Sequence, residues 1–264
     1  MLRTKGQDTM RTGMDYHIHT FYQRCGNWTM TVPAVIRKCE QCRLTSIAIT
    51  DHLNHLGQLD AFHYIKRDIQ DTATDLDVYF GVELNFQSCD GDFAYNEEIH
   101  EKLGFEVVIG GIHSTYTDSQ NLREVLEIQH RHFMKTLENP LVDVLVHPFW
   151  FCRSEVAARS PEWWEKLIET LPDDYISAWA ETSRRNHCAI ELNVAAIFYY
   201  DALSERFKAH YVDFVQRLME KGALFSVGSD AHDINWLGST DYAEGLLAAL
   251  RMPEEQVWRP SRHS

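Results

Sequence analysis

Seven short apolar segments recur along the chain, and stretches with helical periodicity separate them. Each apolar segment has the length and composition of a buried strand. In the stretches between them, apolar residues return every three to four positions, as in amphipathic helices. Strands that alternate with helices predict a parallel sheet. The predicted strands are residues 14–19, 46–50, 78–83, 107–111, 142–147, 188–193 and 224–228.

The length of the chain fits one α/β domain. Its 264 residues are close to the size of a single α/β barrel. No repeat, low-complexity tract or long linker marks a domain boundary. We therefore expect a poorly ordered leader over residues 1–13 and one barrel domain over residues 14–264. The predicted helices are residues 32–43, 60–70, 96–103, 119–137, 161–168, 173–186, 204–221 and 240–250.

Charge and composition exclude several classes of partner. The chain has 25 Lys and Arg against 39 Asp and Glu, a net charge of −14. That charge repels long nucleic acids and anionic membranes. No segment reaches the ~20 apolar residues of a membrane helix, and the first residues lack the apolar part of a secretory signal. Six cysteines are too few for a disulfide scaffold, so we expect a reduced, cytoplasmic setting. No pattern predicts an oligomeric state.

The carboxyl ends of the predicted strands carry an unusual set of polar residues. Active sites of α/β barrels form at these ends, where side chains from different strands converge. Every predicted strand ends in, or is soon followed by, a residue that can bind a metal ion. These residues are His17, His19, Asp51, His52, Glu83, His113, His147, Glu191, Asp230 and His232.

The residue types and their spacing favour several ions. Asp15, His17 and His19 alternate along one strand and so share one face. The two imidazoles can bind one ion, while Asp15 can hydrogen-bond the far nitrogen of a ligand. Histidine mixed with carboxylates suits Zn, Mn or Fe. So many donors exceed what one ion can use, so we expect two or three divalent ions with a carboxylate bridging a pair.

Six short motifs follow one another in the chain. They are HIHT at 17–20, ITDH at 49–52, GVEL at 81–84, GGIHS at 110–114, LVHP at 145–148 and GSDAH at 228–232. In this order they resemble the PHP (polymerase and histidinol phosphatase) family. The resemblance implies a distorted (β/α)7 TIM-like barrel, up to three metal ions at the carboxyl ends of the strands, and phosphoesterase activity. Only 30 residues separate Glu83 from His113, which resembles the compact, histidinol-phosphatase-like members.

The resemblance also implies three ligand sets. The first comprises His17, His19, Glu83 and Asp230. The second comprises His52, His232 and a residue of the loop after His19, for which Cys25 is the best-placed candidate; alternatively, water fills that place or the ion binds weakly. The third comprises Glu83, His113 and His147. Asp15, Asp51 and Glu191 are expected to support these ligands.

The expected activity is hydrolysis of a phosphate ester on a small metabolite. A hydroxide that bridges clustered ions is a strong nucleophile at neutral pH and would attack phosphorus. Arg153, Arg159 and His55 lie in segments after the strands and are candidates to contact the phosphorylated substrate. The alternatives are a phosphodiesterase or exonuclease on short oligonucleotides, a hydrolase of C–N bonds, and an inactive metal-binding scaffold.

Overall fold

All the strands run parallel and lie in one sheet. The computed structural model describes residues 13–261, so residues 1–12 of the expected leader lie outside it. The sheet order is β1-β2-β4-β5-β6-β7-β8, and the short β3 also pairs with β4. The strands are β1 (Met14–Ile18), β2 (Ser46–Ile49), β3 (His52–Leu53), β4 (Asp77–Asn85), β5 (Val107–Gly111), β6 (Val144–Leu145), β7 (Ala189–Asn193) and β8 (Phe225–Gly228).

The seven predicted strands are present, and one difference concerns the second. The chain leaves β2 after Ile49 and pairs again with β4 at His52, so β2 and β3 together occupy one position in the sheet. A second difference is β6, which is limited to two residues. The prediction of a nearly closed, seven-stranded α/β barrel is confirmed.

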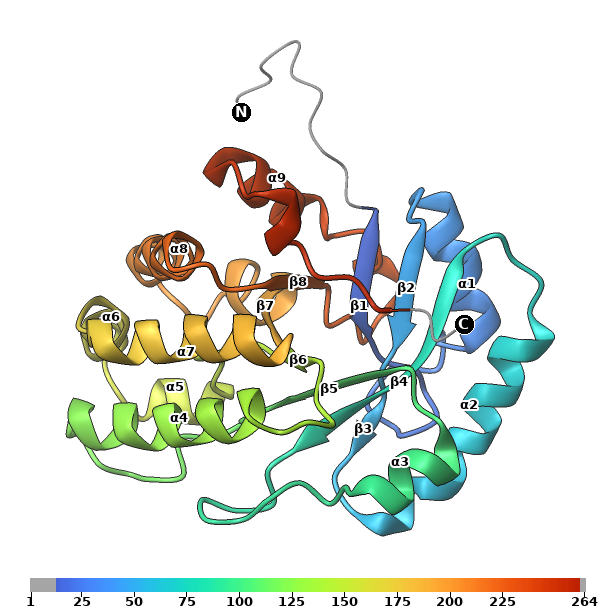
Figure 1. Cartoon of the computed structure of the whole chain (residues 1–264), viewed down its shortest axis with the longest axis horizontal. Coiled ribbons are helices and arrows are strands. Elements are labelled where there is room, and N and C mark those ends of the chain that lie inside the picture. Colours follow the sequence, from blue (N-terminus) through green and yellow to red (C-terminus); the bar gives the residue numbers. More distant parts are fainter. Residues whose placement is uncertain (1–12, 262–264) are drawn as a thin grey trace.

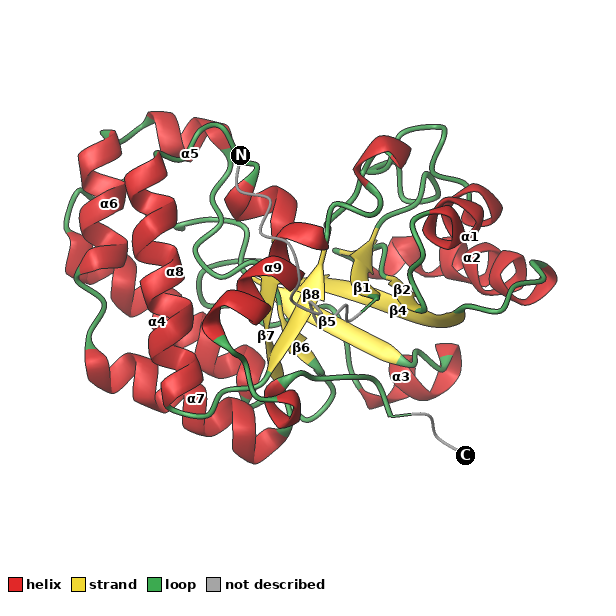
Figure 2. Cartoon of the chain, turned by 90° about the horizontal axis from the view of Figure 1, so that it is seen from above, coloured by secondary structure: helices red, strands yellow, loops and turns green. Residues whose placement is uncertain are grey.

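Two groups of helices lie beside the two halves of the sheet. Figures 1 and 2 show α4, α6, α7 and α8 beside β5–β8, with α1 and α2 beside β1–β4. The helices are α1 (Val32–Gln41), α2 (Leu59–Asp71), α3 (Glu97–Leu103), α4 (Leu122–Leu137), α5 (Arg153–Ala157), α6 (Pro161–Glu169), α7 (Asp173–Asn186), α8 (Glu205–Glu220) and α9 (Asp241–Leu250). In the part of the chain that the structure describes, no helix is long and apolar enough to cross a membrane.

Several helix boundaries follow from local sequence. Thr31 precedes α1 and its side chain accepts a hydrogen bond from the backbone of Ala34, while Pro33 occupies the first turn. Ser204 caps α8 in the same way through Phe207 N. Helix α3 ends at Gly104, whose φ of +65° glycine adopts without strain. The short helix α5 was not predicted, because five residues carry too little periodicity.

The barrel closes between its first and last strands in two ways. At the carboxyl end, Asp230 N donates to His17 O at 2.9 Å and His19 N donates to Ala231 O at 3.1 Å. At the other end, the C-terminal segment pairs with β8: Trp258 N donates to Phe225 O at 2.8 Å. The Trp258 ring also meets the ring of Tyr16 on β1 edge-on, with centroids 5.5 Å apart. Direct closure at the carboxyl end brings the first and last motifs together.

This packing predicts that Trp258 stabilises the barrel. Because its side chain is 9% exposed, Trp258→Ala should lower the free energy of unfolding by about 3–5 kcal/mol. Urea denaturation measures the change. Trp28→Ala is the matched control, because Trp28 is 84% exposed and its removal should cost little. Equal effects of the two substitutions would contradict this account of barrel closure.

Candidate metal centre

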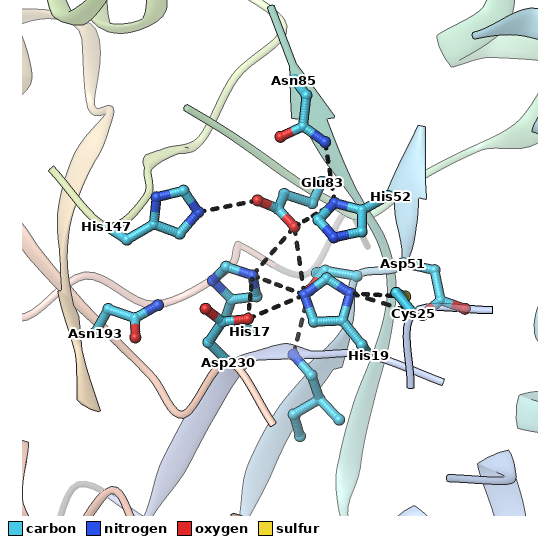
Figure 3. Close-up of polar contacts among 12 residues, drawn as sticks. His17, His19, Cys25, Asp51, His52, Glu83, Asn85, His147, Asn193 and Asp230 are labelled. Carbon is cyan, nitrogen blue, oxygen red and sulfur yellow. Dashed lines mark hydrogen bonds and ion pairs between the residues drawn. The ribbon is translucent and has the colours of Figure 1, made fainter. Parts of the chain in front are cut away.

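The carboxylate of Glu83 lies at the centre of a buried cluster at the carboxyl end of the barrel (Figure 3). Glu83 is on β4, in register with His52 on β3. Five histidines place a ring nitrogen within 3.3 Å of its two oxygens. They are His17, His19, His52, His113 and His147. The fold therefore gathers residues that lie 130 positions apart in the sequence around one carboxylate.

The first group of donors surrounds Glu83 Oε2. The Nε2 atoms of His17 and His19 are 3.0 Å apart, and each lies 3.3 Å from Glu83 Oε2. Asp230 Oδ1 is 3.5 Å from the His17 nitrogen and 3.3 Å from the His19 nitrogen. Ligands at 2.0–2.1 Å from a tetrahedral ion are about 3.3 Å from one another. Five of the six distances among these four atoms are therefore close to the edge length of such a coordination shell.

The second group surrounds Glu83 Oε1. His113 Nε2 lies 3.2 Å from this oxygen and His147 Nε2 lies 3.1 Å from it. The ring centroid of Trp150 is 5.4 Å from that of His113 and 5.5 Å from that of His147, so Trp150 packs beside both histidines. The two oxygens of Glu83 thus face different sets of donors, as expected of a bridging carboxylate.

The third group contains the one cysteine of the cluster. Donor atoms of His19, Cys25, His52 and His232 all lie within 4.8 Å of one another. Cys25 Sγ is 3.6 Å from His19 Nδ1. His232 Nδ1 is 2.9 Å from Asp230 O, which leaves its Nε2 free for an ion. Burial, with Asp51 nearby, raises the pKa of the Cys25 thiol to about 12, so the thiol is protonated when no ion is bound.

The charges of the cluster depend on one another. Burial opposes ionisation of Glu83, but the adjacent His52 and His17 outweigh it and hold the Glu83 pKa well below its usual value. Burial also opposes protonation of His17, yet Glu191, Asp230 and Glu83 raise the His17 pKa well above normal. A buried carboxylate of this kind needs positive charge beside it, from imidazolium or from a metal cation.

The donor set fits metal ions. Glu83 Oε2 is buried and has no hydrogen-bond partner among residues 13–261, although three imidazole nitrogens surround it. Imidazole nitrogens crowded around a carboxylate oxygen that accepts no hydrogen bond are an arrangement suited to coordinating a cation. Imidazole, carboxylate and thiol donors together suit Zn and related transition metals.

Glu191 on β7 supports the first two groups. Its Oε1 accepts a hydrogen bond from His17 Nδ1 at 2.8 Å, which turns His17 Nε2 toward the cluster. Its Oε2 accepts from His147 N at 2.8 Å and from Asn193 Nδ2 at 3.0 Å. We expected Asp15 to hold a ligand's far nitrogen, and this was wrong. Asp15 instead accepts from Ser229 N at 2.9 Å, and burial raises its pKa to about 7.

Asp51 supports the loop that follows β1. It accepts hydrogen bonds from both the backbone nitrogen and the hydroxyl of Thr20. Its Oδ1 also lies 3.9 Å from His19 Nδ1. Burial raises the pKa of Asp51 to about 6. Asp51 thereby holds the start of the loop that carries Cys25 toward His52 and His232.

The three predicted substrate contacts lie outside the cluster. Arg153 is exposed and forms an ion pair with Asp201. His55 is exposed at the start of a short 3-10 turn. The expectation for Arg159 needs correction: its side chain is buried and donates to Thr117 O and Ser119 O. The contacts of Arg153 and His55 with substrate remain predictions.

Two asparagines at the cluster were not predicted. Asn85 follows Glu83 by two positions on β4, and its Nδ2 lies 3.0 Å from His52 Nδ1 (Figure 3). Asn193 follows Glu191 by two positions on β7 and donates to it. Alternate residues of a strand share one face. This spacing was therefore the signal that could have identified both side chains.

The close packing at Gly228 yields a prediction. A Cβ atom there would lie 2.0 Å from Glu191 Oε1 and 2.5 Å from His17 Cβ. Gly228→Ala should displace both side chains, lower the metal content, and cost about 1–3 kcal/mol of stability. Metal analysis and urea denaturation measure these effects. Gly245→Ala on α9 is the control, because a Cβ atom at Gly245 would meet no neighbouring atom within 4 Å. This substitution should raise the free energy of unfolding by roughly 0.5–1 kcal/mol and leave the metal content unchanged. Unchanged metal content in Gly228→Ala would contradict the prediction.

Comparisons with known proteins agree with this architecture. A protein of Caldanaerobacter subterraneus named "probable phosphatase" is 26% identical over 97% of this chain and 91% of its own length. One of Proteus mirabilis with the same name is 21% identical over 94% and 90%. The solved "putative histidinol phosphatase" of Listeria monocytogenes shares the fold, with a TM-score of 0.58, 12% identity, and coverage of 85% of this chain and 97% of that one. Residues 15–195 match the PHP domain, and the chain therefore belongs to the PHP family.

Proposed function

We propose that this protein is a metal-dependent phosphatase that hydrolyses a phosphate monoester of a small metabolite. The observation that carries the proposal is the set of donor atoms around Glu83. Five of the distances among the donor atoms of His17, His19, Glu83 and Asp230 are 3.0–3.5 Å. Membership of the PHP family and relatives named as probable phosphatases support the reaction class. The net charge of −14 disfavours long nucleic acids as substrates.

The proposed ligand sets follow the three groups of donors. His17, His19, Glu83 and Asp230 would hold the first ion, and Cys25, His52 and His232 would hold the second. Glu83, His113 and His147 would hold the third, so Glu83 belongs to two of the sets. Each set is supported by donor atoms that already lie near one another in the fold.

The protein side chains supply position and charge. When bound, the ions neutralise the phosphoryl oxygens and activate the water that attacks phosphorus. Glu191 orients His17, and Asp51 holds the loop that carries Cys25. His113 and His232 are the more exposed members, with side chains 29% and 42% exposed, so the substrate enters beside them. Arg153, at the start of α5, is a candidate to contact the substrate if the phosphate displaces Asp201.

Turnover of simple aryl phosphates tests the proposal. With Zn, Mn or Fe supplied, the protein should hydrolyse an aryl monoester faster than an aryl diester, and a chelator should abolish turnover. Glu83→Gln should lose metal and reduce turnover more than about 100-fold, because it removes the bridging charge. Glu181→Gln is a control on the exposed surface of α7. Preference for the diester would favour the oligonucleotide alternative, and metal binding without turnover would favour the inactive scaffold.

Cys25 distinguishes the second ion from the other two. A thiolate ligand must lose its proton, and in the metal-free protein the pKa of Cys25 is about 12. The affinity of this ion should therefore rise by about tenfold per pH unit between pH 6 and 8. Titration with Co²⁺ should also produce a sulfur-to-metal absorption band in the near ultraviolet. The band should vanish in Cys25→Ser and the pH dependence should become weaker, since only His52 would then release a proton. Both effects should persist in Cys89→Ser, and a Cys25→Ser protein with the unchanged band would exclude thiolate ligation.

A further inference from the structure

The loop between β5 and α4 carries His113 but has no regular structure of its own. Residues 112–121 form neither helix nor strand. His113 nevertheless places Nε2 3.2 Å from Glu83 Oε1. A ligand on an irregular loop keeps its position only if other parts of the protein hold the loop. Those contacts come mainly from the segment that follows β6.

Glu155 on α5 holds the loop directly after His113. Its Oε1 accepts hydrogen bonds from Ser114 Oγ at 2.6 Å and from Thr115 N at 2.9 Å. The single hydroxyl hydrogen of Thr115 is shared between Glu155 Oε1, at 3.1 Å, and Thr117 O, at 2.9 Å. These contacts fix the two residues next to the proposed ligand. The other oxygen of Glu155, Oε2, is buried and lacks a hydrogen-bond partner in the described part of the chain. The hydrogen bonds that this carboxylate accepts therefore come from the loop.

Arg159 and Trp163 hold the distal half of the same loop. Arg159 Nη2 donates to Thr117 O at 2.6 Å and to Ser119 O at 3.0 Å. Its guanidinium lies over the rings of Trp163 and Trp164, at 4.8 and 5.4 Å from the ring centroids. Trp163 Nε1 donates to Gln120 O at 2.9 Å. The carbonyl oxygens of Thr117, Ser119 and Gln120 thus accept hydrogen bonds from the side chains of Arg159 and Trp163.

The same segment is tied to the other proposed ligand of this ion. Helix α5 begins at Arg153, six positions after His147, and buried Phe149 and Phe151 anchor the intervening chain. His147 itself has a φ of +28°, a strained conformation that needs support from its surroundings. One short stretch of chain therefore fixes the distance between His113 and His147.

We infer that Glu155 is a positioning residue for the ion proposed at Glu83, His113 and His147, and that Arg159 completes the same clamp on the loop. The inference rests on the proposed function, because it assumes that His113 is a ligand. Glu155 acts through Ser114 and Thr115 and touches neither substrate nor ion. Outer partners of this kind commonly set metal affinity by about 10- to 100-fold.

Titration of the metal-free protein with Zn²⁺ against a chelating dye tests the inference. Glu155→Ala should weaken one binding step by about 10- to 100-fold, and His113→Ala should weaken the same step. The double variant should bind no more weakly than His113→Ala alone, because the two residues act on one ion. Glu155→Gln keeps an acceptor oxygen and should restore much of the lost affinity.

Leu167→Ala on α6 controls for general loss of stability. Leu167 is fully buried in the same helical layer, so its truncation should lower the thermal midpoint without weakening any Zn²⁺ step. If His113→Ala weakens one step and Glu155→Ala weakens none, the role of Glu155 is refuted while the metal centre stands. If Leu167→Ala mimics Glu155→Ala, the effect is general destabilisation and the inference also fails. If His113→Ala changes no step, the proposed ligand set itself is wrong.

Discussion

The burial of Glu83 is the constraint on which the rest of this structure depends. A carboxylate without solvent contact is costly unless positive charge compensates it. Here His52 and His17 provide that charge in the metal-free protein, and they hold the pKa of Glu83 well below its usual value. Yet five histidines cannot all be protonated at such close range, and burial with neighbouring His52 lowers the pKa of His19 well below normal. Bound metal ions would resolve this conflict, because they would place concentrated positive charge between donors that are then all neutral or anionic.

The backbone around the cluster carries strain for the same reason. His147 and Asp230 have φ angles of +28° and +55°, a region that costs a non-glycine residue about 1–3 kcal/mol. Each turns its side chain back toward the barrel axis immediately after a strand ends. Hydrogen bonds hold both in place: His147 N donates to Glu191, and Asp230 N donates to His17 O across the barrel closure. Closure of the sheet and assembly of the site are therefore one event, since Asp230 reaches His17 only where β1 and β8 meet.

Much of the fold and of the cluster could be predicted from the sequence, because both follow from local periodicity. Buried strands can be recognised by their apolar composition, and the carboxyl ends of parallel strands in a barrel converge. His17, Glu83 and His147 could therefore be placed together from the sequence alone. Contacts that depend on the twist and closure of the sheet could not be predicted in this way. Asp15 and Glu191 are both strand carboxylates, yet only Glu191 reaches the His17 ring. Arg159 had the residue type of a phosphate ligand, but its direction depends on how α5 packs on a loop that no pattern describes.

The positions of the charged side chains bear on how the proposed phosphate substrate would bind. The Arg159 guanidinium donates hydrogen bonds to carbonyl oxygens of the loop, and the Arg153 guanidinium forms an ion pair with Asp201. Both guanidinium groups therefore already have partners in this structure. Three carboxylates, Glu83, Asp230 and Glu191, lie around His17 at the centre of the cluster. If the proposed function holds, bound ions would place positive charge where a phosphorylated substrate needs it. Metal occupancy would then control substrate binding as well as turnover.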